Sequence, residues 1–409
     1  MAHHHMSTET KPLLPLSGTR ILDLTAVLLG PYATQMLADY GAEVIKIEPP
    51  TGDTTRYIGP TKEKGMAAIF LGLNRNKRSV VLDLKQSAAR DALLQLVDGA
   101  DVLIHSMRPQ KMAALGLSPQ TLRERNPRLV VVAAYGFAEG GPYSGRPAYD
   151  DIIQATCGIA GLFEQVQGRP AYVPTVLADK TSGLFAAQAI LMALLARERD
   201  GVGSEVEVPM FETMVGFMLS DHHYGAQFEP PLSPPGYVRL LSKYRRPFKT
   251  LDGYIALMPY TDANWRMFFT EIGKVELVAD KRFIGVAART ENIEALYDIL
   301  ETAVATRSTA DWLQASERLD IPAARINKLD ELESDPHLVA TGFFKTMHDE
   351  KIGKLRRPGA SLRFKGMEPA AEFPPRLGQH TAEVLSEFGL AAEEVEALIA
   401  GGAAVQWKG

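Results

Sequence analysis

Apolar residues in the first half of the chain gather in short runs, with longer amphipathic segments between some of them. Runs of this length are typical of buried strands, and they cover residues 19–25, 42–50, 78–84, 100–106 and 128–137. Residues 30–41 and 87–99 lie between runs and have the pattern of helices. Strands that alternate with helices predict an α/β domain, in which helices cover both faces of a parallel sheet.

The second half of the chain has a different pattern. Residues 247–260 predict a hairpin, because two apolar runs flank a turn at Asp252–Gly253. Residues 262–273 and 308–319 repeat apolar positions at helical spacing. Together these segments predict a smaller α+β domain that follows the α/β domain.

The length of the chain, 409 residues, favours two domains, because single cores stop growing beyond about 250–300 residues. The start, "MAHHHMSTET", has the composition of a tag remnant and carries no functional residue. We predict a tag or disordered start at 1–10, the first part of a large domain at 11–200, a linker at 201–224, a small domain at 225–330, and a linker with a part returning to the large domain at 331–409.

Composition narrows the class of protein. Apolar residues make up 46% of the chain and charged residues 23%, as in ordinary soluble globular proteins. The formal net charge of −5 argues against a nucleic-acid partner. The longest apolar run, residues 182–196, is too short to cross a bilayer, so we expect no membrane partner. Cys157 is the only cysteine, which excludes a disulfide framework and favours a cytoplasmic location.

Ligands of parallel sheets bind beyond the carboxyl ends of the strands. The loops after Thr25, Ile47, His105 and Gly136 are therefore the first candidates for a binding site. The segment "LLGPYA" contains a single glycine and makes no dinucleotide fingerprint, and the chain has no P-loop.

Basic residues lie next to two of the predicted strands, 78–84 and 100–106. Arg75 and Lys77 lie in "LNRNKRSV", where a phosphate site and a solvated charged turn are equally good explanations. Arg108 follows the strand 100–106, at an end where ligands bind. Ser106 beside His105 does not indicate a hydrolase, because neighbours in a strand point to opposite faces.

An isolated acid, Asp179, lies in "PTVLADKTSG" at the start of a helical segment. It can cap that helix through its side-chain oxygen, or its carboxylate can attack a carbonyl carbon in a partly dry pocket. The two roles are compatible, because the positive end of a helix stabilises an ionised carboxylate. Asp150 likewise either caps a helix or contacts a substrate. His222 and His223 are adjacent and lack metal-ligand spacing, so we expect no metal site.

The order and spacing of several motifs resemble those of the class III coenzyme A (CoA) transferases, the family of formyl-CoA transferase and carnitine CoA-transferase. The resemblance covers nearly the whole chain. Its motifs are "GPYATQMLADYGAEVIKIEPPTGD", "NRNKRSVVLDLK", "MRPQKMAALGL", "NPRLVVVAAYGF", "GPYSGRPAYDDIIQATCG" and "GRPAYVPTVLADKTSG". It implies a Rossmann-like large CoA-binding domain, a small domain, and two chains interlocked as a homodimer.

The resemblance also implies a mechanism. Asp179 would attack the thioester of an acyl-CoA donor, and CoA would pass through an aspartyl anhydride and an aspartyl-CoA thioester to a carboxylic acid. No metal and no tightly bound cofactor would be needed, since CoA is a substrate. The implied CoA contacts are Val27, Leu28, Arg75, Lys77, Ser106, Met107 and Arg108. The candidates for the acyl pocket are Tyr135, Phe137, Glu139 and Tyr149, with the segment around Tyr244–Arg246.

The chain departs from the family pattern at several positions. His105-Ser106-Met107 replaces the usual Glu-Asn-aromatic triplet, Leu28 replaces a glutamine of formyl-CoA transferase, and the glycine-rich flap of that enzyme is absent. The resemblance therefore does not extend to formyl or oxalate specificity.

Two alternatives stay open. A 2-methylacyl-CoA racemase of the same fold would need a histidine where Tyr149 lies, and a phenol with a pKa of about 10 is a poor substitute near neutral pH. A non-catalytic CoA-binding protein would need no acid at Asp179. Exchange of CoA between thioester donors and free acids distinguishes the transferase from both.

Overall fold

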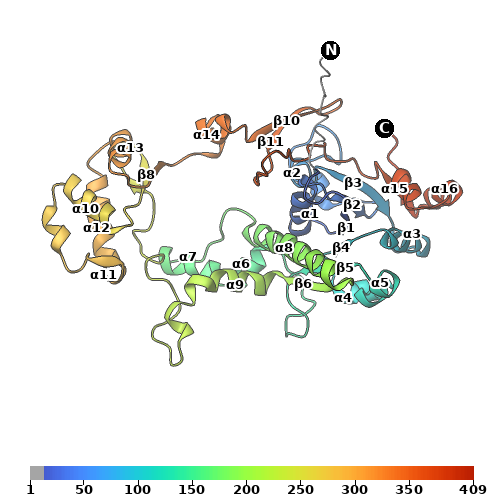
Figure 1. The fold of residues 1–409 in the computed structure, drawn as a ribbon, viewed down its shortest axis with the longest axis horizontal. Coiled ribbons are helices and arrows are strands. Elements are labelled where there is room, and N and C mark those ends of the chain that lie inside the picture. The colour runs from blue at the N-terminus through green and yellow to red at the C-terminus, as the bar shows by residue number, and fades with distance from the viewer. Residues whose placement is uncertain (1–12) are drawn as a thin grey trace, which may run out of the picture. The chain divides into compact units, whose positions relative to one another are not determined.

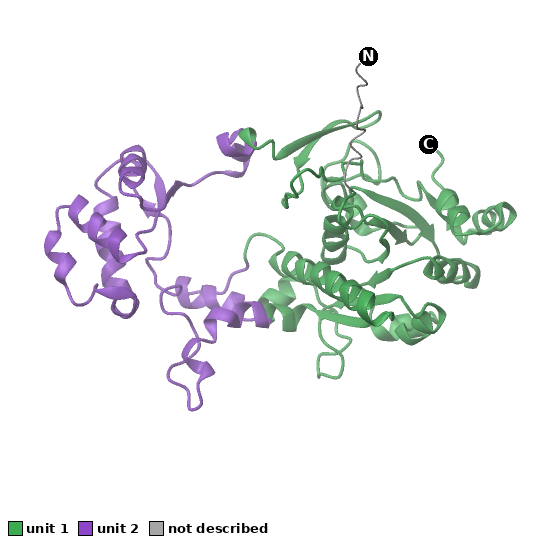
Figure 2. Ribbon diagram, in the orientation of Figure 1, with its two compact units in different colours: residues 1–156, 173–214, 339–409 green, residues 157–172, 215–338 purple. Residues whose placement is uncertain are grey.

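The computed structural model describes residues 13–409, which divide into two compact units (Figures 1 and 2). Unit 1 comprises the residues up to 156 together with 173–214 and 339–409, and unit 2 comprises residues 157–172 and 215–338. Each unit therefore combines segments that lie far apart in the sequence. The expected tag or disordered start at 1–10 lies outside the described residues.

Unit 1 is built on a sheet that has seven strands within residues 13–409. They are β1 (Arg20–Leu24), β2 (Glu43–Glu48), β3 (Lys77–Leu82), β4 (Val102–His105), β5 (Val130–Tyr135), β6 (Glu205–Pro209) and β12 (Ala404–Val405). The spatial order is β12-β3-β2-β1-β4-β5-β6, and only β12 runs antiparallel to its neighbour. The predicted parallel α/β architecture is confirmed, with the strand order of a Rossmann sheet.

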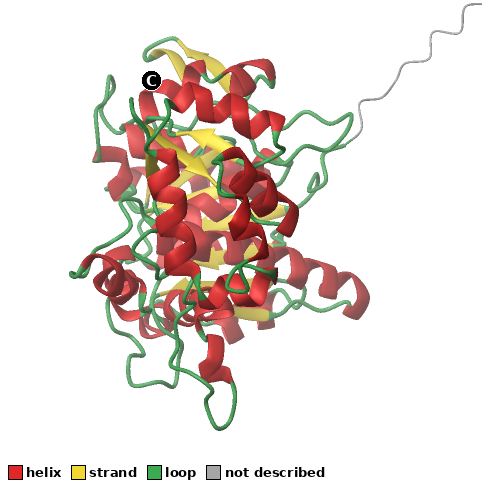
Figure 3. Ribbon diagram, turned by 90° about the vertical axis from the view of Figure 1, so that its left-hand side faces the viewer, coloured by secondary structure: helices red, strands yellow, loops and turns green. Residues whose placement is uncertain are grey.

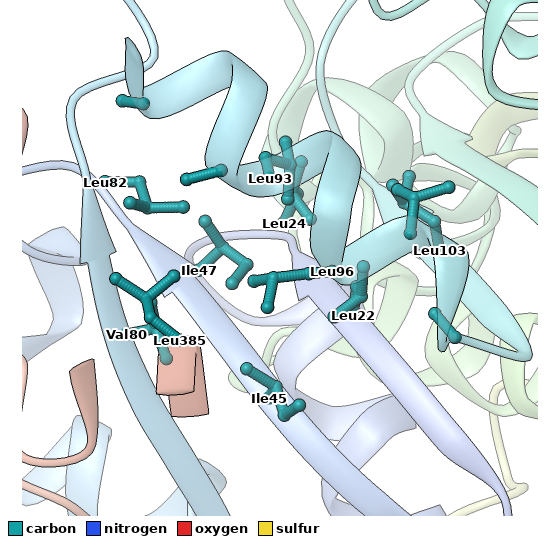
Figure 4. Close-up of a cluster of buried hydrophobic side chains, with 14 of the residues drawn as sticks. Leu22, Leu24, Ile45, Ile47, Val80, Leu82, Leu93, Leu96, Leu103 and Leu385 are labelled. Atoms are coloured by element: carbon teal, nitrogen blue, oxygen red, sulfur yellow. The ribbon is translucent and has the colours of Figure 1, made fainter. Parts of the chain in front are cut away.

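One face of this sheet carries an apolar core (Figure 4). Leu22 of β1 lies opposite Ile45 of β2 and Leu103 of β4, so these side chains share one face. Each fully buried aliphatic side chain of this size contributes roughly 1.5–3 kcal/mol. The helices that cover this face include α3 (Ser87–Asp98), α5 (Pro119–Arg125), α15 (Thr381–Glu387) and α16 (Ala392–Ala400).

The opposite face of β1, β2 and β3 buries charges beneath α1 (Leu29–Asp39). Lys77 Nζ lies 3.1 Å from Asp23 Oδ2, and Lys46 Nζ lies 3.0 Å from Asp53 Oδ2, with all four side chains almost wholly buried. Thr34 of α1 donates a hydrogen bond of 2.6 Å to Asp23. Burial costs these charges their hydration, so their stability depends on the pairing.

The pKa values show which contributions prevail in this charged layer. Burial alone would raise the pKa of Asp23, but Lys77, Lys46 and two threonine hydroxyls outweigh it and hold that pKa well below its usual range. Burial lowers the pKa of Lys77 to about 8, although Asp23 opposes the shift. Both groups are therefore mainly charged at neutral pH.

The remaining elements of unit 1 surround the sheet. α8 (Leu177–Asp200) packs against α1 and β5. The others are α2 (Ala68–Leu73), α4 (Pro109–Ala114), α6 (Asp150–Thr156), the short 3-10 helix η1 (Thr54–Tyr57) and the hairpin of β10 (Phe344–Asp349) with β11 (Gly353–Pro358).

The range 201–224 is not the linker that we predicted. It contains β6, which pairs with β5, and most of it continues as α9 (Met210–His222). β6 has the sequence EVEVP and lies at the edge of the sheet. Edge strands tolerate charged residues, so this strand lacks the continuous apolar run that identified the inner strands.

Unit 2 is largely helical. Figure 3 shows the helices, strands and loops of the described chain in separate colours. Trp265, Phe268, Phe269 and Trp312 are almost wholly buried in the core of unit 2. Its helices are α7 (Ile159–Gln167), α10 (Asp262–Glu271), α11 (Gly285–Glu291), α12 (Ile293–Val304) and α13 (Thr309–Arg318), with α14 (Pro336–Ala340) at the boundary and 3-10 helices η2 (Tyr224–Gln227), η3 (Val275–Ala279) and η4 (Leu329–Ser334).

A small antiparallel sheet completes unit 2. Its strands are β7 (Phe248–Lys249), β8 (Tyr254–Leu257) and β9 (Ala323–Arg325), in the order β7-β8-β9. The predicted hairpin is confirmed, because Thr250 N donates to Gly253 O across the turn between β7 and β8. None of the helices within residues 13–409 combines the length and apolar character needed to span a membrane.

The buried pair gives a stability prediction. Replacing Lys77 by Met leaves the Asp23 carboxylate buried without its nearest cation, so the free energy of unfolding should fall by about 3–5 kcal/mol. Urea denaturation measures the loss. Arg125→Met is the control, because it removes an exposed ion pair with Asp98 and should cost at most about 1 kcal/mol. Equal losses in the two variants would contradict the structural role of Lys77.

Candidate active site

Asp179 lies in the first turn of α8, with its side chain nearly buried. The helix begins after Val176, which is the N-cap residue and makes no capping hydrogen bond through its own side chain, so Asp179 lies inside the first turn. The alternative that Asp179 merely caps the helix is therefore wrong. None of residues 13–409 forms an ion pair with the Asp179 carboxylate, so its charge is not used for a structural contact.

A second buried acid, Asp150, lies beside Asp179. Asp150 begins α6, and its Oδ1 accepts a hydrogen bond of 2.9 Å from the backbone N of Asp179. Gln154 Nε2 donates to Asp150 Oδ2 at 2.5 Å. The helix-capping alternative for Asp150 thus gives way to a different role, because this carboxylate fixes the start of α8 relative to α6.

Burial, and to a smaller extent the charge of Asp150, raise the pKa of Asp179 to about 7. The positive end of α8 acts in the opposite sense, but it does not overcome these two effects. Asp179 is therefore a carboxyl group that changes its protonation state near neutral pH. In a low-dielectric pocket, the ionised form is a stronger base than an ordinary aspartate and a better nucleophile for a carbonyl carbon.

Close packing brings the start of α8 near the β1–α1 loop. A Cβ atom on Gly183 would lie 2.8 Å from Leu29 O and 3.1 Å from Tyr32 Cδ1, so only glycine permits this approach. Asp179 lies one helical turn before Gly183. The carboxyl group is thus placed at the same end of α1 as the predicted contact residues Val27 and Leu28.

The β1–α1 loop is held in an unusual conformation. Val27 has a φ of 68°, a region that a β-branched residue rarely adopts. Its backbone N faces both carboxylate oxygens of Asp53 at 3.3 Å. Lys46 binds the same carboxylate and also donates a hydrogen bond of 2.9 Å to Thr25 O. The buried charged layer therefore holds the loop in its strained form, and such strain is common at functional sites.

A cavity of about 440 Å³ opens at the carboxyl ends of β1, β2, β3 and β4. This is the point at which the strand order reverses, where ligands of such sheets bind. Ala26 N donates to Ser106 Oγ at 3.4 Å, which joins the loops after β1 and β4. The lining residues are Leu24, Ala26, Ile47, Glu48, Pro49, Leu82, Asp83, Leu84, Lys85, Ser106, Met107, Arg108, Lys111 and Leu115.

Three of the predicted CoA contacts lie together in this cavity and two others do not. Ser106, Met107 and Arg108 line it, whereas Arg75 and Lys77 are buried elsewhere. The Arg75 guanidinium forms a bidentate pair with the carboxylate of Asp39. Lys77 Nζ is surrounded by protein acceptors. The charges of both residues are used within the fold.

The four candidates for the acyl pocket have separate environments. Phe137 is buried and packs 5.3 Å from the ring of Tyr143. The Tyr135 hydroxyl donates 2.7 Å to Glu207, and burial together with that carboxylate raises the pKa of Tyr135. Glu139 is exposed and accepts a hydrogen bond from Ser144. Tyr149, 68% exposed, directly precedes Asp150 and is the candidate whose sequence position is nearest to the acidic pair.

Sequence reasoning missed the contribution of β3 to the cavity. Leu82, Asp83, Leu84 and Lys85 follow this strand and line the cavity, and the rule that ligands bind at strand carboxyl ends would have found them. His105 is buried, and its Nδ1 donates to Met107 O at 3.1 Å. Burial lowers the pKa of His105 to about 4, so this residue is neutral near pH 7.

Within residues 13–409, no group of three or more His, Cys, Asp or Glu side chains is arranged to hold a metal ion. The chemical features of unit 1 are thus a carboxyl group with a pKa near neutrality and a strand-end cavity that includes basic residues.

Comparison with known proteins identifies the class of protein. The model of CoA-transferase family III matches residues 16–381. The chain is 32% identical to the probable fatty acyl-CoA transferase Rv3272 of Mycobacterium tuberculosis, over 92% of this chain and 99% of that protein. A crystal structure of a mutant of Rv3272 matches with a TM-score of 0.82 and 32% identity, covering 92% of this chain and 99% of that chain.

Two further relatives have named substrates. The acetyl-CoA:oxalate CoA-transferase of Acetobacter aceti is 33% identical, over 93% of this chain and 98% of that protein. The succinyl-CoA:glutarate CoA-transferase of Mus musculus is 31% identical, over 91% of this chain and 86% of that protein. The chain therefore belongs to CoA-transferase family III, the CaiB/BaiF type. It is an acyl-CoA transferase, as the motif resemblance led us to expect.

The environment of Asp179 can be tested by chemical labelling. A water-soluble carbodiimide reacts with the protonated carboxyl, so labelling of Asp179 should persist until about pH 7, where an ordinary aspartate no longer reacts. Mass spectrometry of the peptide gives the extent of labelling at each pH. In Asp150→Asn the neighbouring negative charge is gone, and the pH of half-labelling should fall.

Asp151→Asn is the matched control for this titration, because Asp151 follows Asp150 in the sequence but its side chain is exposed. It should leave the titration of Asp179 unchanged. The same midpoint in the wild type and in Asp150→Asn would show that Asp150 does not influence the carboxyl group of Asp179.

Proposed function

We propose that this enzyme moves CoA from an acyl-CoA thioester to a carboxylic acid through a covalent intermediate on Asp179. The observation that carries the proposal is the carboxyl group of Asp179, which is nearly buried, has a raised pKa and forms no ion pair with residues 13–409. Once ionised, such a group is a poorly solvated nucleophile.

The first half-reaction transfers CoA to the enzyme. An oxygen of Asp179 attacks the thioester carbonyl, the carbon–sulfur bond breaks, and CoA leaves as its thiolate with the bonding electron pair. The thiolate then attacks the Asp179 carbonyl of the resulting mixed anhydride. The donor acid departs as a carboxylate, and an aspartyl-CoA thioester remains on the enzyme.

The second half-reaction is the reverse of the first with another acid. The acceptor carboxylate attacks the aspartyl thioester and expels the CoA thiolate, which forms a second mixed anhydride. The thiolate then attacks the acyl carbonyl of the acceptor, giving the new acyl-CoA and the free carboxylate of Asp179. One thioester replaces another, so the protein needs only to hold the reactants in position and to exclude water.

The strand-end cavity is our candidate for the nucleotide portion of CoA. Its floor includes Leu24, Ile47 and Leu82, and its rim carries Arg108 and Lys111. An apolar floor suits an aromatic base, and basic side chains suit phosphates. We assign the phosphates to Arg108 and Lys111 rather than to Arg75 and Lys77, because the latter two are paired inside the fold.

The acceptor belongs to the class of small carboxylic acids. The names of two relatives specify oxalate and glutarate as acids, which supports a dicarboxylate but leaves its length open. Tyr149, exposed and next to Asp150 in sequence, remains our candidate for a contact with the acyl group.

A homodimer is also part of this proposal. The support is a row of exposed apolar side chains on α8, which a second copy of the chain would cover. The row consists of Leu184, Phe185, Leu191, Met192 and Leu195. Sedimentation equilibrium that shows only monomer at micromolar concentration would contradict it.

The nucleophile is tested by substitution and trapping. Asp179→Asn should lower kcat for CoA transfer by at least about a thousandfold, because no covalent intermediate can form. In the wild type, hydroxylamine should trap an acyl or CoA adduct that mass spectrometry maps to Asp179. Asp151→Asn is the control and should keep its activity.

Contrary outcomes are clear for this experiment. Full activity of Asp179→Asn, or an adduct on another residue, would exclude Asp179 as the nucleophile.

A separate experiment distinguishes transfer from racemisation. With a 2-methylacyl-CoA in deuterated water and no acceptor acid, transfer chemistry leaves the α-hydrogen in place. Rapid gain of deuterium would indicate a racemase instead.

The CoA site is tested by binding. Arg108→Gln should weaken CoA by roughly 10- to 150-fold, as expected for the loss of about 1.5–3 kcal/mol from one charged hydrogen bond. Arg128→Gln, an exposed variant in the same unit, should bind CoA as the wild type does. Calorimetry at low and high salt should also show weaker binding at high salt. An unchanged dissociation constant for Arg108→Gln would remove this residue from the site.

A further inference from the structure

A second cavity, of about 340 Å³, lies in unit 2 and contains three arginines. Arg239 precedes the small sheet in the sequence, and Arg245 and Arg246 directly precede β7. The lining residues of this arginine cavity are Arg239, Arg245, Arg246, Pro247, Phe248, Ala256, Leu257, Met258, Pro259, Tyr297 and Leu300. All of them belong to unit 2, so the cavity is complete within that unit.

The floor of the arginine cavity is apolar and belongs to the core of unit 2. Phe248 of β7 and Leu257 of β8 are buried in the core of unit 2, as is Leu300 of α12. Tyr297, from the same helix, is also buried and packs 6.2 Å from the ring of Phe248. A cavity with such a floor favours a ligand that has an apolar part, which inorganic anions lack.

The charges around the cavity are not balanced. Arg246 forms an ion pair of 2.9 Å with Glu301, but neither Arg239 nor Arg245 has a carboxylate partner among residues 13–409. Arg239 Nε donates 3.1 Å to the Tyr297 hydroxyl, and its Nη2 faces the sulfur of Met258, a weak acceptor, at 3.7 Å. Two guanidinium groups at this cavity therefore have donors left for an anion.

Tyr297 adds a further donor. Its hydroxyl oxygen accepts the hydrogen bond from Arg239, which leaves the O–H of this buried phenol to donate. A carboxylate is the anion that best matches a guanidinium fork and a neighbouring hydroxyl, because its two oxygens accept in one plane.

We propose that the arginine cavity binds a short aliphatic dicarboxylate. One carboxylate meets Arg239 and the Tyr297 hydroxyl, the other meets Arg245, and the carbon chain lies on the floor formed by Phe248, Leu257 and Leu300. The volume is at the lower end of the range for small-molecule sites, so a dicarboxylate of a few carbons fits and a whole CoA does not. The proposal rests on unit 2 alone and does not depend on the role of Asp179.

Calorimetric titration of the full-length protein with glutarate, in a low-salt buffer free of phosphate and other carboxylates, tests this site. We expect binding by the wild type at a dissociation constant of about 1 mM or tighter. Arg239→Gln and Arg245→Gln should each weaken it by at least about tenfold. Tyr297→Phe, which removes only the hydroxyl, should weaken it several-fold while thermal unfolding shows an intact fold.

Two control variants test whether the loss of glutarate binding is specific to the arginines of this cavity. Arg282→Gln removes another exposed arginine of unit 2, one that is paired with Asp280, and should bind glutarate normally. Arg108→Gln, which is altered at the proposed CoA site, should also bind glutarate as the wild type does. Butyrate, with one carboxylate, should bind more weakly than glutarate.

Several outcomes would overturn the proposal. No heat of binding with about 10 mM glutarate would do so, as would equal binding by the wild type, Arg239→Gln and Arg245→Gln. Phosphate that competes as well as glutarate would show a general anion site. Easier dissociation of an oligomer in Arg239→Gln, without glutarate binding by the wild type, would show that a protein carboxylate occupies the cavity instead.

Discussion

The ion pair between Asp23 and Lys77 is the interaction on which the rest of unit 1 depends. It joins the central strand β1 to β3 through a layer that excludes water, where an unpaired charge costs several kcal/mol. Lys46, on the strand between them, extends the layer to Asp53, and Asp53 in turn holds the backbone of Val27 at a positive φ. The same buried charges that order the sheet therefore shape the loop beside the candidate active site.

Asp179, in contrast to Asp23, forms no ion pair with residues 13–409. Lys180, next to Asp179 in sequence, donates a hydrogen bond of 2.8 Å to Thr175 Oγ1 instead. Burial and Asp150 then prevail over the helix terminus and raise the pKa of Asp179. A nearby cation would make the carboxylate more stable but less nucleophilic. The arrangement thus suits a group that forms and breaks bonds to carbon.

The apolar runs identified the inner strands because those strands are buried on both faces, and the edge strand β6 escaped notice because its Glu residues face solvent. The order of the motifs pointed to Asp179. Whether the side chains of Arg75 and Lys77 face a ligand or the interior of the fold could not be predicted. A basic segment has the same composition whether its side chains face solvent or a buried acid. The decisive partners, Asp39 and Asp23, lie 36 and 54 residues away in the sequence.

The last segment of the chain completes the outer edge of β3. Thr381 Oγ1 accepts a hydrogen bond from Val81 N and donates one to Val405 O, and His380 Nδ1 accepts one from Ser79 N. These contacts satisfy the outer edge of β3, whose free backbone groups would otherwise need water or another strand. Although all the parallel strands and Asp179 precede residues 215–338, the larger segment of unit 2, the sheet is finished only by His380 and Thr381, some 300 positions after the β3 residues that they contact. Unit 1 therefore depends on both ends of the chain.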